Sequence, residues 1–83
     1  MAHGKIRYWA AAKEAAGLAE EPFDAVTLDE LMTKITTDRE ELARIVRRCS
    51  FLVDGHPVGR RAHDTVVLAE GATVEVLPPF AGG

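Results

Sequence analysis

The chain has 83 residues, of which 47% are hydrophobic and 28% are charged, and its formal net charge is −3 at pH 7. This length suits one small domain with one core, and the composition is that of a globular chain, not a disordered one. The negative balance argues against nucleic acid as the main partner, the single cysteine excludes a disulfide framework and a cysteine-held iron–sulfur cluster, and no apolar run is long enough to span a membrane.

The N-terminal residues predict a strand followed by a short helix. Residues 5–10 alternate between two faces, and Trp9 falls on the face opposite Tyr8, which is typical of a half-buried strand. Residues 10–16 are rich in alanine, the best helix former, and Gly17 follows where a left-handed residue would end a helix.

The next segment predicts an edge strand and then the start of a longer helix. Residues 20–26 contain apolar positions suited to a strand, but Pro22 has no N–H to donate and restricts that strand to a sheet edge. Thr27 and Glu30 fit a capping box, in which the Thr27 hydroxyl accepts from the Glu30 amide while the Glu30 carboxylate reaches back.

The remaining elements complete an α+β pattern. Helical spacing of apolar residues continues beyond an interruption at residues 36–38, and it leaves open whether there are two helices or one bent helix. Asp54-Gly55 is typical of a type I′ hairpin turn, residues 65–68 form a short β-branched run, and residues 73–77 alternate as a last strand. This order predicts one mixed sheet with helices packed on one face.

After the last strand the sequence reads Pro78-Pro79-Phe80-Ala81-Gly82-Gly83. The prolines favour an extended backbone, and six extended residues would reach roughly 20 Å beyond the core. We therefore divide the chain into a domain at residues 1–77 and a flexible tail at residues 78–83, slender enough to thread a narrow pocket on another protein. The alternative is a frayed terminus, against which the apolar Phe80 and the lack of a linker argue.

The ending at residues 74–83 resembles that of the MoaD/ThiS family of ubiquitin-like sulfur carriers, and its two prolines and phenylalanine are most similar to the molybdopterin branch. Residues 7–12, 27–31 and 64–71 extend the resemblance over nearly the whole chain. The resemblance implies a β-grasp, ubiquitin-like fold, which the α+β element order independently allows.

The resemblance also implies chemistry at the last residue. An adenylating enzyme would use ATP to convert the Gly83 carboxylate to an acyl-adenylate, and a sulfur donor would then displace AMP to leave a thiocarboxylate. The loaded tail would enter the large subunit of molybdopterin synthase and give its sulfur to cyclic pyranopterin monophosphate. Because Gly82 has no side chain, it would let the tail pass into the narrow pocket of the partner. The chain would bind no cofactor itself, and it would act as a small subunit and protein cosubstrate.

Partner binding is expected around the tail and on one exposed aromatic. Because Trp9 alternates away from Tyr8, we expect it to be partly exposed and to form an apolar docking surface with Leu77 and Phe80. The expected partner-binding residues are Leu77, Pro78, Pro79, Phe80, Ala81 and Trp9.

Other reactive or charged residues have simpler interpretations. Cys49 lies on an apolar helical stripe and is interpreted as a small core residue. The three histidines have no spacing that suits a metal site, so no metal is expected. Five arginines between residues 44 and 61 form either a solvated face or a docking surface: Arg44, Arg47, Arg48, Arg60 and Arg61.

Three further functions remain open from the sequence. A sulfur carrier for thiamine or cysteine synthesis would share the Gly-Gly ending, and a protein modifier would join Gly83 to lysines on target proteins. In a plain binding module the tail would be incidental. We expect a cytoplasmic protein, because the N-terminus lacks the apolar stretch of a signal peptide. The negative net charge and the lack of a long apolar run lead us to expect no nucleic-acid or membrane partner.

Overall fold

The structure is a computed structural model, and it describes residues 2–79. Within these residues five strands form one mixed sheet in the order β2-β1-β5-β3-β4. In chain order the elements are β1 (His3–Tyr8), α1 (Ala10–Ala16), β2 (Glu20–Asp24), α2 (Leu28–Thr36), α3 (Glu40–Val46), β3 (Ser50–Val53), β4 (His56–Pro57), the 3₁₀ turn η1 (His63–Thr65) and β5 (Thr73–Leu77). The predicted α+β class is confirmed, and Pro22 lies in the edge strand β2 as expected.

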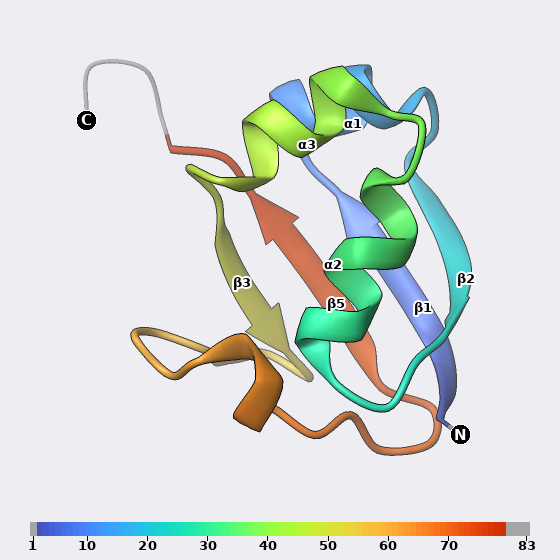
Figure 1. The fold of residues 1–83 in the computed structure, drawn as a ribbon, viewed down its shortest axis with the longest axis vertical. Helices are drawn as coiled ribbons and strands as arrows, with labels where there is room; N and C mark the ends of the chain where they lie inside the picture. Colours follow the sequence, from blue (N-terminus) through green and yellow to red (C-terminus); the bar gives the residue numbers. More distant parts are fainter. Residues whose placement is uncertain (1, 80–83) are drawn as a thin grey trace.

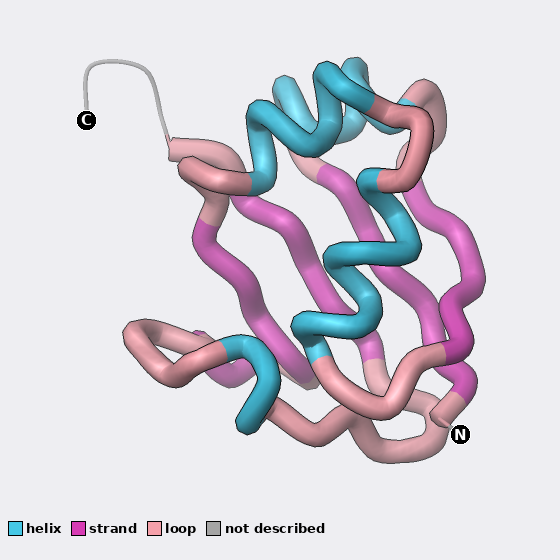
Figure 2. The backbone as a smooth tube through the Cα atoms, viewed as in Figure 1, coloured by secondary structure: helices cyan, strands magenta, loops and turns pink. Residues whose placement is uncertain are grey.

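The helices cover one face of this sheet. Figure 1 shows α2 crossing in front of the strands, with α1 and α3 side by side at the end where β1 and β5 finish. Figure 2 shows that loops gather mainly at the opposite end, where the N-terminus also lies. The backbone thus places the last described residues next to α3 and away from the loop-rich end.

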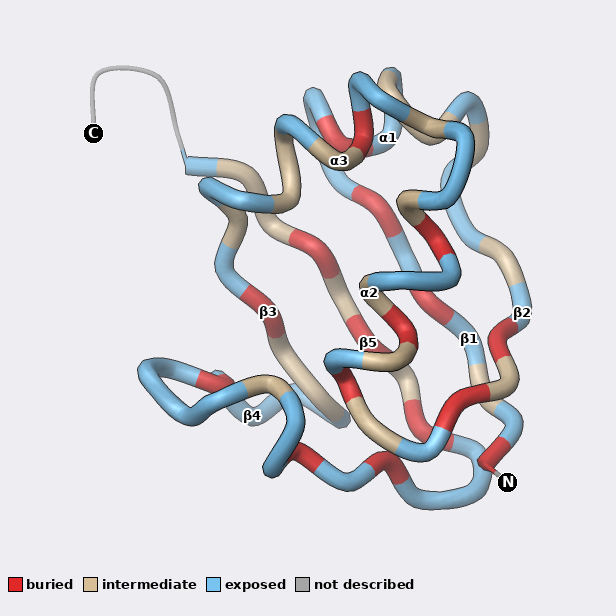
Figure 3. The backbone as a smooth tube through the Cα atoms, in the orientation of Figure 1, coloured by how far each residue is buried: buried red, intermediate tan, exposed pale blue. Residues whose placement is uncertain are grey.

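The core lies between the sheet and the helices. Figure 3 shows buried positions alternating along β1 and β5, as the predicted strand periodicity requires. Each fully buried aliphatic side chain stabilises the fold by about 1.5–3 kcal/mol. The largest fully buried side chains are Ile6, Leu28, Leu31, Leu42, Val74 and Val76.

Local turn and cap signals are confirmed. The Thr27 Oγ1 accepts a hydrogen bond from the Glu30 N–H at 3.1 Å, although the Glu30 carboxylate reaches the Val26 N–H and not that of Thr27. The interruption expected at residues 36–38 separates two distinct helices: α2 includes Thr36, and residues 37–39 lie between α2 and α3, with Asp38 at φ +59°. The chain therefore forms two helices and not one bent helix, because a left-handed residue interrupts the right-handed helical path.

The first strand differs from its expected bounds, and the β-branched run forms no strand. The first strand ends at Tyr8, because Ala10 adopts φ +49° and begins α1. The β-branched run at residues 65–68 does not form a strand. Its Val66 carbonyl accepts from the Leu28 N–H, at 2.9 Å, so this segment is bonded to the start of α2 and only one isolated bridge remains there.

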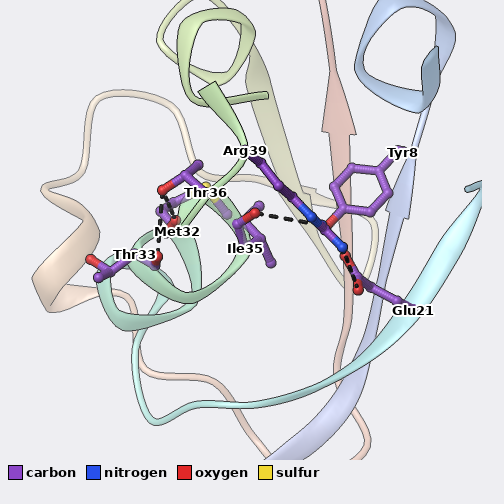
Figure 4. A network of polar contacts seen from close by, with 7 residues as sticks. All are labelled: Tyr8, Glu21, Met32, Thr33, Ile35, Thr36 and Arg39. Carbon is purple, nitrogen blue, oxygen red and sulfur yellow. Dashed lines mark hydrogen bonds and ion pairs between the residues drawn. The ribbon is translucent and has the colours of Figure 1, made fainter. Parts of the chain in front are cut away.

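A polar cluster joins the sheet to the start of α3, as Figure 4 shows. The Tyr8 hydroxyl donates to Glu21 Oε2 at 2.6 Å, and the Arg39 guanidinium donates to both carboxylate oxygens of Glu21 at 2.7 and 3.3 Å. The Arg39 hydrogen bond is the main reason that the pKa of Glu21 is lowered, whereas burial is the main reason that the pKa of Tyr8 is raised. The ion pair therefore links β2 to the segment between α2 and α3.

This cluster predicts an acid-dependent loss of stability. Because the folded-state pKa of Glu21 lies below its usual value near 4.5, ionised Glu21 stabilises the fold above that value, and the contribution is lost as the pH falls further. We expect Glu21→Gln to lower the free energy of unfolding by ~1 kcal/mol near neutral pH. In urea titrations the gap between wild type and variant should close under acid conditions.

Glu20→Gln is the matched control, because Glu20 precedes Glu21 and its ion pairs with Lys5 and Arg7 are more exposed. We expect this control to lose less stability than Glu21→Gln at neutral pH. A stability gap for Glu21→Gln that does not change with pH would contradict the assignment of the stabilising charge to Glu21.

Candidate functional site

The candidate site lies where β1 and β5 end. These strands pair in parallel, with Tyr8 opposite Val76, so both finish at the same edge of the sheet. The Trp9 N–H continues the ladder by donating to the Val76 carbonyl at 3.2 Å. The first residue after β1 is therefore held beside the end of β5, from which the tail departs. In Figure 1 both strands finish at the upper end of the sheet.

The indole of Trp9 is exposed but fixed in place. Trp9 is 43% exposed, and its Nε1–H donates to Glu75 Oε1 at 3.2 Å. The guanidinium carbon of Arg7 lies 5.3 Å from the ring centroid, which is a cation–π geometry. An exposed aromatic with few conformations to lose is well suited to binding a partner, because little entropy is lost when it is buried.

The base of the tail lies beside strand β3. Leu77 is paired with Ser50, Leu77 and Pro78 are half-buried, and Pro79 is exposed. The structure thus brings Trp9, Leu77 and the two prolines to one edge of the sheet. The other expected site residues, Phe80, Ala81, Gly82 and Gly83, lie outside the described residues.

An open hollow of about 920 Å³ adjoins Trp9. Its lining comes from the end of β1, from α1 and from the turn into β2, and it includes Arg7, Lys13 and Glu14. The hollow exists because α1 begins directly after Trp9, so the chain turns away from the sheet at Ala10. Its mixed charges and apolar indole suit contact with another protein surface.

Sequence reasoning missed Arg7 and Glu75 as residues that hold the indole. Both were visible as outward-facing positions of alternating strands. The register of the parallel pair places Arg7 directly opposite Glu75, and this register is a tertiary property. The only sequence signal available was the outward position of each residue.

Cys49 is packed and protonated. Its Sγ donates to the Ile45 carbonyl at 3.2 Å, and the half-buried side chain packs against the core. Burial raises the pKa of the Cys49 thiol to about 11. The thiolate is the reactive form, so this thiol is a poor nucleophile near neutral pH, in agreement with its interpretation as a core residue.

The histidines are dispersed in the structure. His3 lies 3.7 Å from the carboxylates of Asp24 and Glu70, and His63 packs edge-on against Phe51 with ring centroids 5.1 Å apart. Among residues 2–79 there is no group of three or more His, Cys, Asp or Glu side chains that could hold a metal ion. Over the same range no helix has both the length and the apolar character needed to cross a membrane.

The sequence matches the ThiS family over residues 6–83. A curated relative, the molybdopterin synthase sulfur carrier subunit of Chlamydomonas reinhardtii, is 29% identical over 82 residues. That alignment covers 95% of this chain and 96% of the relative. Both similarities therefore extend over nearly the full length of the chain.

Solved structures share the same architecture. The small archaeal modifier protein 1 of Methanosarcina acetivorans has a TM-score of 0.86 at 21% identity, covering 100% of this chain and 98% of that one. A chain in the complex of subunits 1 and 2 of the molybdopterin-converting factor of Helicobacter pylori has a TM-score of 0.71 at 25% identity, covering 98% and 99%. These similarities confirm the β-grasp, ubiquitin-like fold.

Proposed function

The chain belongs to the ThiS family, and on this premise we propose that it carries sulfur as a thiocarboxylate on Gly83 and donates that sulfur in molybdopterin synthesis. The observation that carries the proposal is the family match, which extends to Gly83 itself. The molybdopterin pathway is favoured by the relative from Chlamydomonas reinhardtii, which is named as a molybdopterin synthase subunit and is similar over nearly its whole length.

The proposed loading has two steps. A Gly83 carboxylate oxygen attacks the α-phosphorus of ATP on an adenylating enzyme, pyrophosphate leaves, and an acyl-adenylate remains. A donor of sulfur at the oxidation level of sulfide then attacks the acyl carbon, the bond to AMP breaks, and a thiocarboxylate is formed. The activation is needed because a carboxylate is a poor electrophile until its oxygen becomes part of a good leaving group.

In this proposal the described residues bind and orient, and the chemistry belongs to the partners. The large subunit of molybdopterin synthase would accept the loaded tail, and the complex of two subunits from Helicobacter pylori supports such a partner. Trp9, Leu77 and Pro78 would meet the rim of the partner's pocket, since they surround the departure point of the tail. The sulfur would pass there to cyclic pyranopterin monophosphate.

Intact-mass measurement tests the loading. The full chain is incubated with ATP, a sulfide source and the adenylating enzyme of the same organism. We expect a mass change equal to one oxygen replaced by sulfur, located on the peptide that contains Gly83. A Cys49→Ala variant is the control, because a persulfide on Cys49 would add sulfur without loss of oxygen. No change, with an enzyme shown active on another carrier, would refute the proposal.

Protein conjugation through Gly83 is the second candidate. It is favoured by the likeness to a small archaeal modifier protein, whose TM-score is 0.86. Conjugation would appear as a ladder of larger species on a denaturing gel, and the ladder would vanish when Gly83 is removed. A carrier for thiamine or cysteine synthesis would instead be loaded normally but fail to transfer sulfur to cyclic pyranopterin monophosphate.

Replacing Trp9 with alanine should weaken partner binding by roughly 10- to 100-fold, because a fixed and exposed aromatic often dominates an interface. The dissociation constant for the large subunit would be measured by calorimetry. Val67→Ala is the matched control: Val67 is 71% exposed and bridges to Thr27 at the start of α2, at the opposite end of the sheet. Equal affinities for wild type and Trp9→Ala would remove Trp9 from the docking surface.

A further inference from the structure

Positive charge is concentrated in one part of the chain. Residues 43–63 contain five arginines and one acidic residue, Asp54, whereas the rest of the chain has five basic and twelve acidic residues. The protein is therefore acidic overall but carries a basic region of opposite sign. We call its side chains the arginine strip: Arg44, Arg47, Arg48, Arg60 and Arg61.

The fold gathers the arginine strip along one side of the molecule. Strand β4 is antiparallel to β3, so the loop after β4 returns toward the start of β3. There Arg47, Phe51 and Gly59 line the same hollow, of about 340 Å³. Arg60 and Arg61 follow Gly59 directly, so two groups of arginines flank this hollow. Figure 3 shows both flanking segments largely exposed.

Most charges of the arginine strip are not neutralised by the fold. Elsewhere the basic residues on the sheet are paired, as Lys5 and Arg7 are with Glu20. Within residues 2–79, Arg47, Arg48 and Arg60 are exposed and take part in no ion pair. Such guanidinium groups keep their donors available for carboxylates on another molecule.

The arginine strip begins beside the departure point of the tail. Ser50, the first residue of β3, pairs with Leu77, the last residue of β5. Arg47 and Arg48 precede Ser50 in the turn that leads from α3, and Figure 1 shows this turn next to the end of β5. A surface that contacts the base of the tail therefore also contacts the strip.

We propose that the arginine strip docks against an acidic surface of the large subunit of molybdopterin synthase, the protein proposed above to receive the loaded tail. The proposal rests on the proposed function, since it requires a receiving protein. Opposite charge would speed association and orient the chain so that the tail approaches its pocket first. A protein partner is favoured over nucleic acid, because the acidic residues outside the strip repel a polyanion such as DNA or RNA.

The test measures the association rate of the full-length chain with the purified large subunit of the same organism. Arg47→Glu and Arg60→Glu should each slow this association about tenfold at low ionic strength. Lys34→Glu is the matched control, because it makes the same charge change at an exposed residue of α2 and should alter the rate less than twofold. The differences should shrink at high salt. Thermal melts establish that each variant is folded.

The outcomes separate this proposal from the proposed function. If the wild type is loaded with sulfur but the strip variants associate normally, the docking proposal alone is overturned. Equal slowing by Lys34→Glu, or association of the wild type that does not depend on salt, overturns it as well. Tight binding of a single-stranded oligonucleotide that Arg47→Glu abolishes would assign the strip to nucleic acid instead. A wild-type chain that does not bind the large subunit and gains no sulfur refutes both proposals.

Discussion

Deleting Gly83 should abolish thiocarboxylate formation, with a loss of rate greater than about 1,000-fold. The shortened chain still ends in a glycine carboxylate, that of Gly82, so its chemical reactivity is unchanged. Only its reach is changed, by about 3.3 Å for one extended residue. A misplacement of roughly 1 Å can already cost 100-fold in rate, because the reacting atoms must be held in an attack geometry.

The loading rate would be measured by intact mass over time, with the adenylating enzyme present at saturating ATP. Adding one alanine after Gly83 should give a similar loss, since the carboxylate is then displaced in the other direction. Val67→Ala is the control, because it alters an exposed residue at the opposite end of the sheet and leaves the tail unchanged. A chain lacking Gly83 that is loaded at the wild-type rate would contradict the assignment of the reaction to a defined position.

Replacing Gly4 with alanine should lower the melting temperature by roughly 10–25 °C. An added Cβ would lie 2.7 Å from the Phe23 ring and still closer to the Ala72 carbonyl oxygen. That carbonyl accepts the Lys5 N–H at 3.0 Å, so it cannot move without weakening the link from β1 to the start of β5. Overpacking of this kind costs about 3 kcal/mol, and each kcal/mol shifts the melting temperature of a domain this size by about 4–8 °C.

Gly17→Ala is the control for the Gly4 variant. Gly17 ends α1 with φ +82°, and an added Cβ there meets no atom within 4 Å. Its replacement should cost only the left-handed backbone strain, about 1 kcal/mol. A Gly4→Ala chain that melts no lower than Gly17→Ala would show that the contact with Phe23 and Ala72 relaxes freely.

Features that depend on neighbours in the chain were predictable from sequence. The left-handed end of α1 at Gly17, the Thr27 cap and the Asp54-Gly55 turn each involve residues a few positions apart, so their side-chain chemistry is sufficient. The Gly82-Gly83 ending was recognisable for the same reason, because its pattern lies in consecutive residues. The exposure of Trp9 followed from strand alternation.

The β-branched run at residues 65–68 shows where local preference fails. It has the composition of a strand, but Val66 and Leu68 are bonded to residues 28 and 26, which start a helix about forty positions earlier. Propensity describes how a segment fits a pleated surface, and here the hydrogen bonds of the segment go to the residues that lead into α2. The competing contact is visible only after the chain has folded.

The sequence by itself determined the element types, the turns, the apolar faces and the terminal Gly-Gly motif. Tertiary structure decided the partners: Glu75 and Arg7 around the indole, Arg39 on Glu21, and the Phe23 ring against Gly4. A period of two assigns each strand residue to a face but leaves the offset between strands open. Contacts between strands that are distant in the chain form only when packing selects one register. The same register brings Trp9 and the arginine strip to the base of the tail.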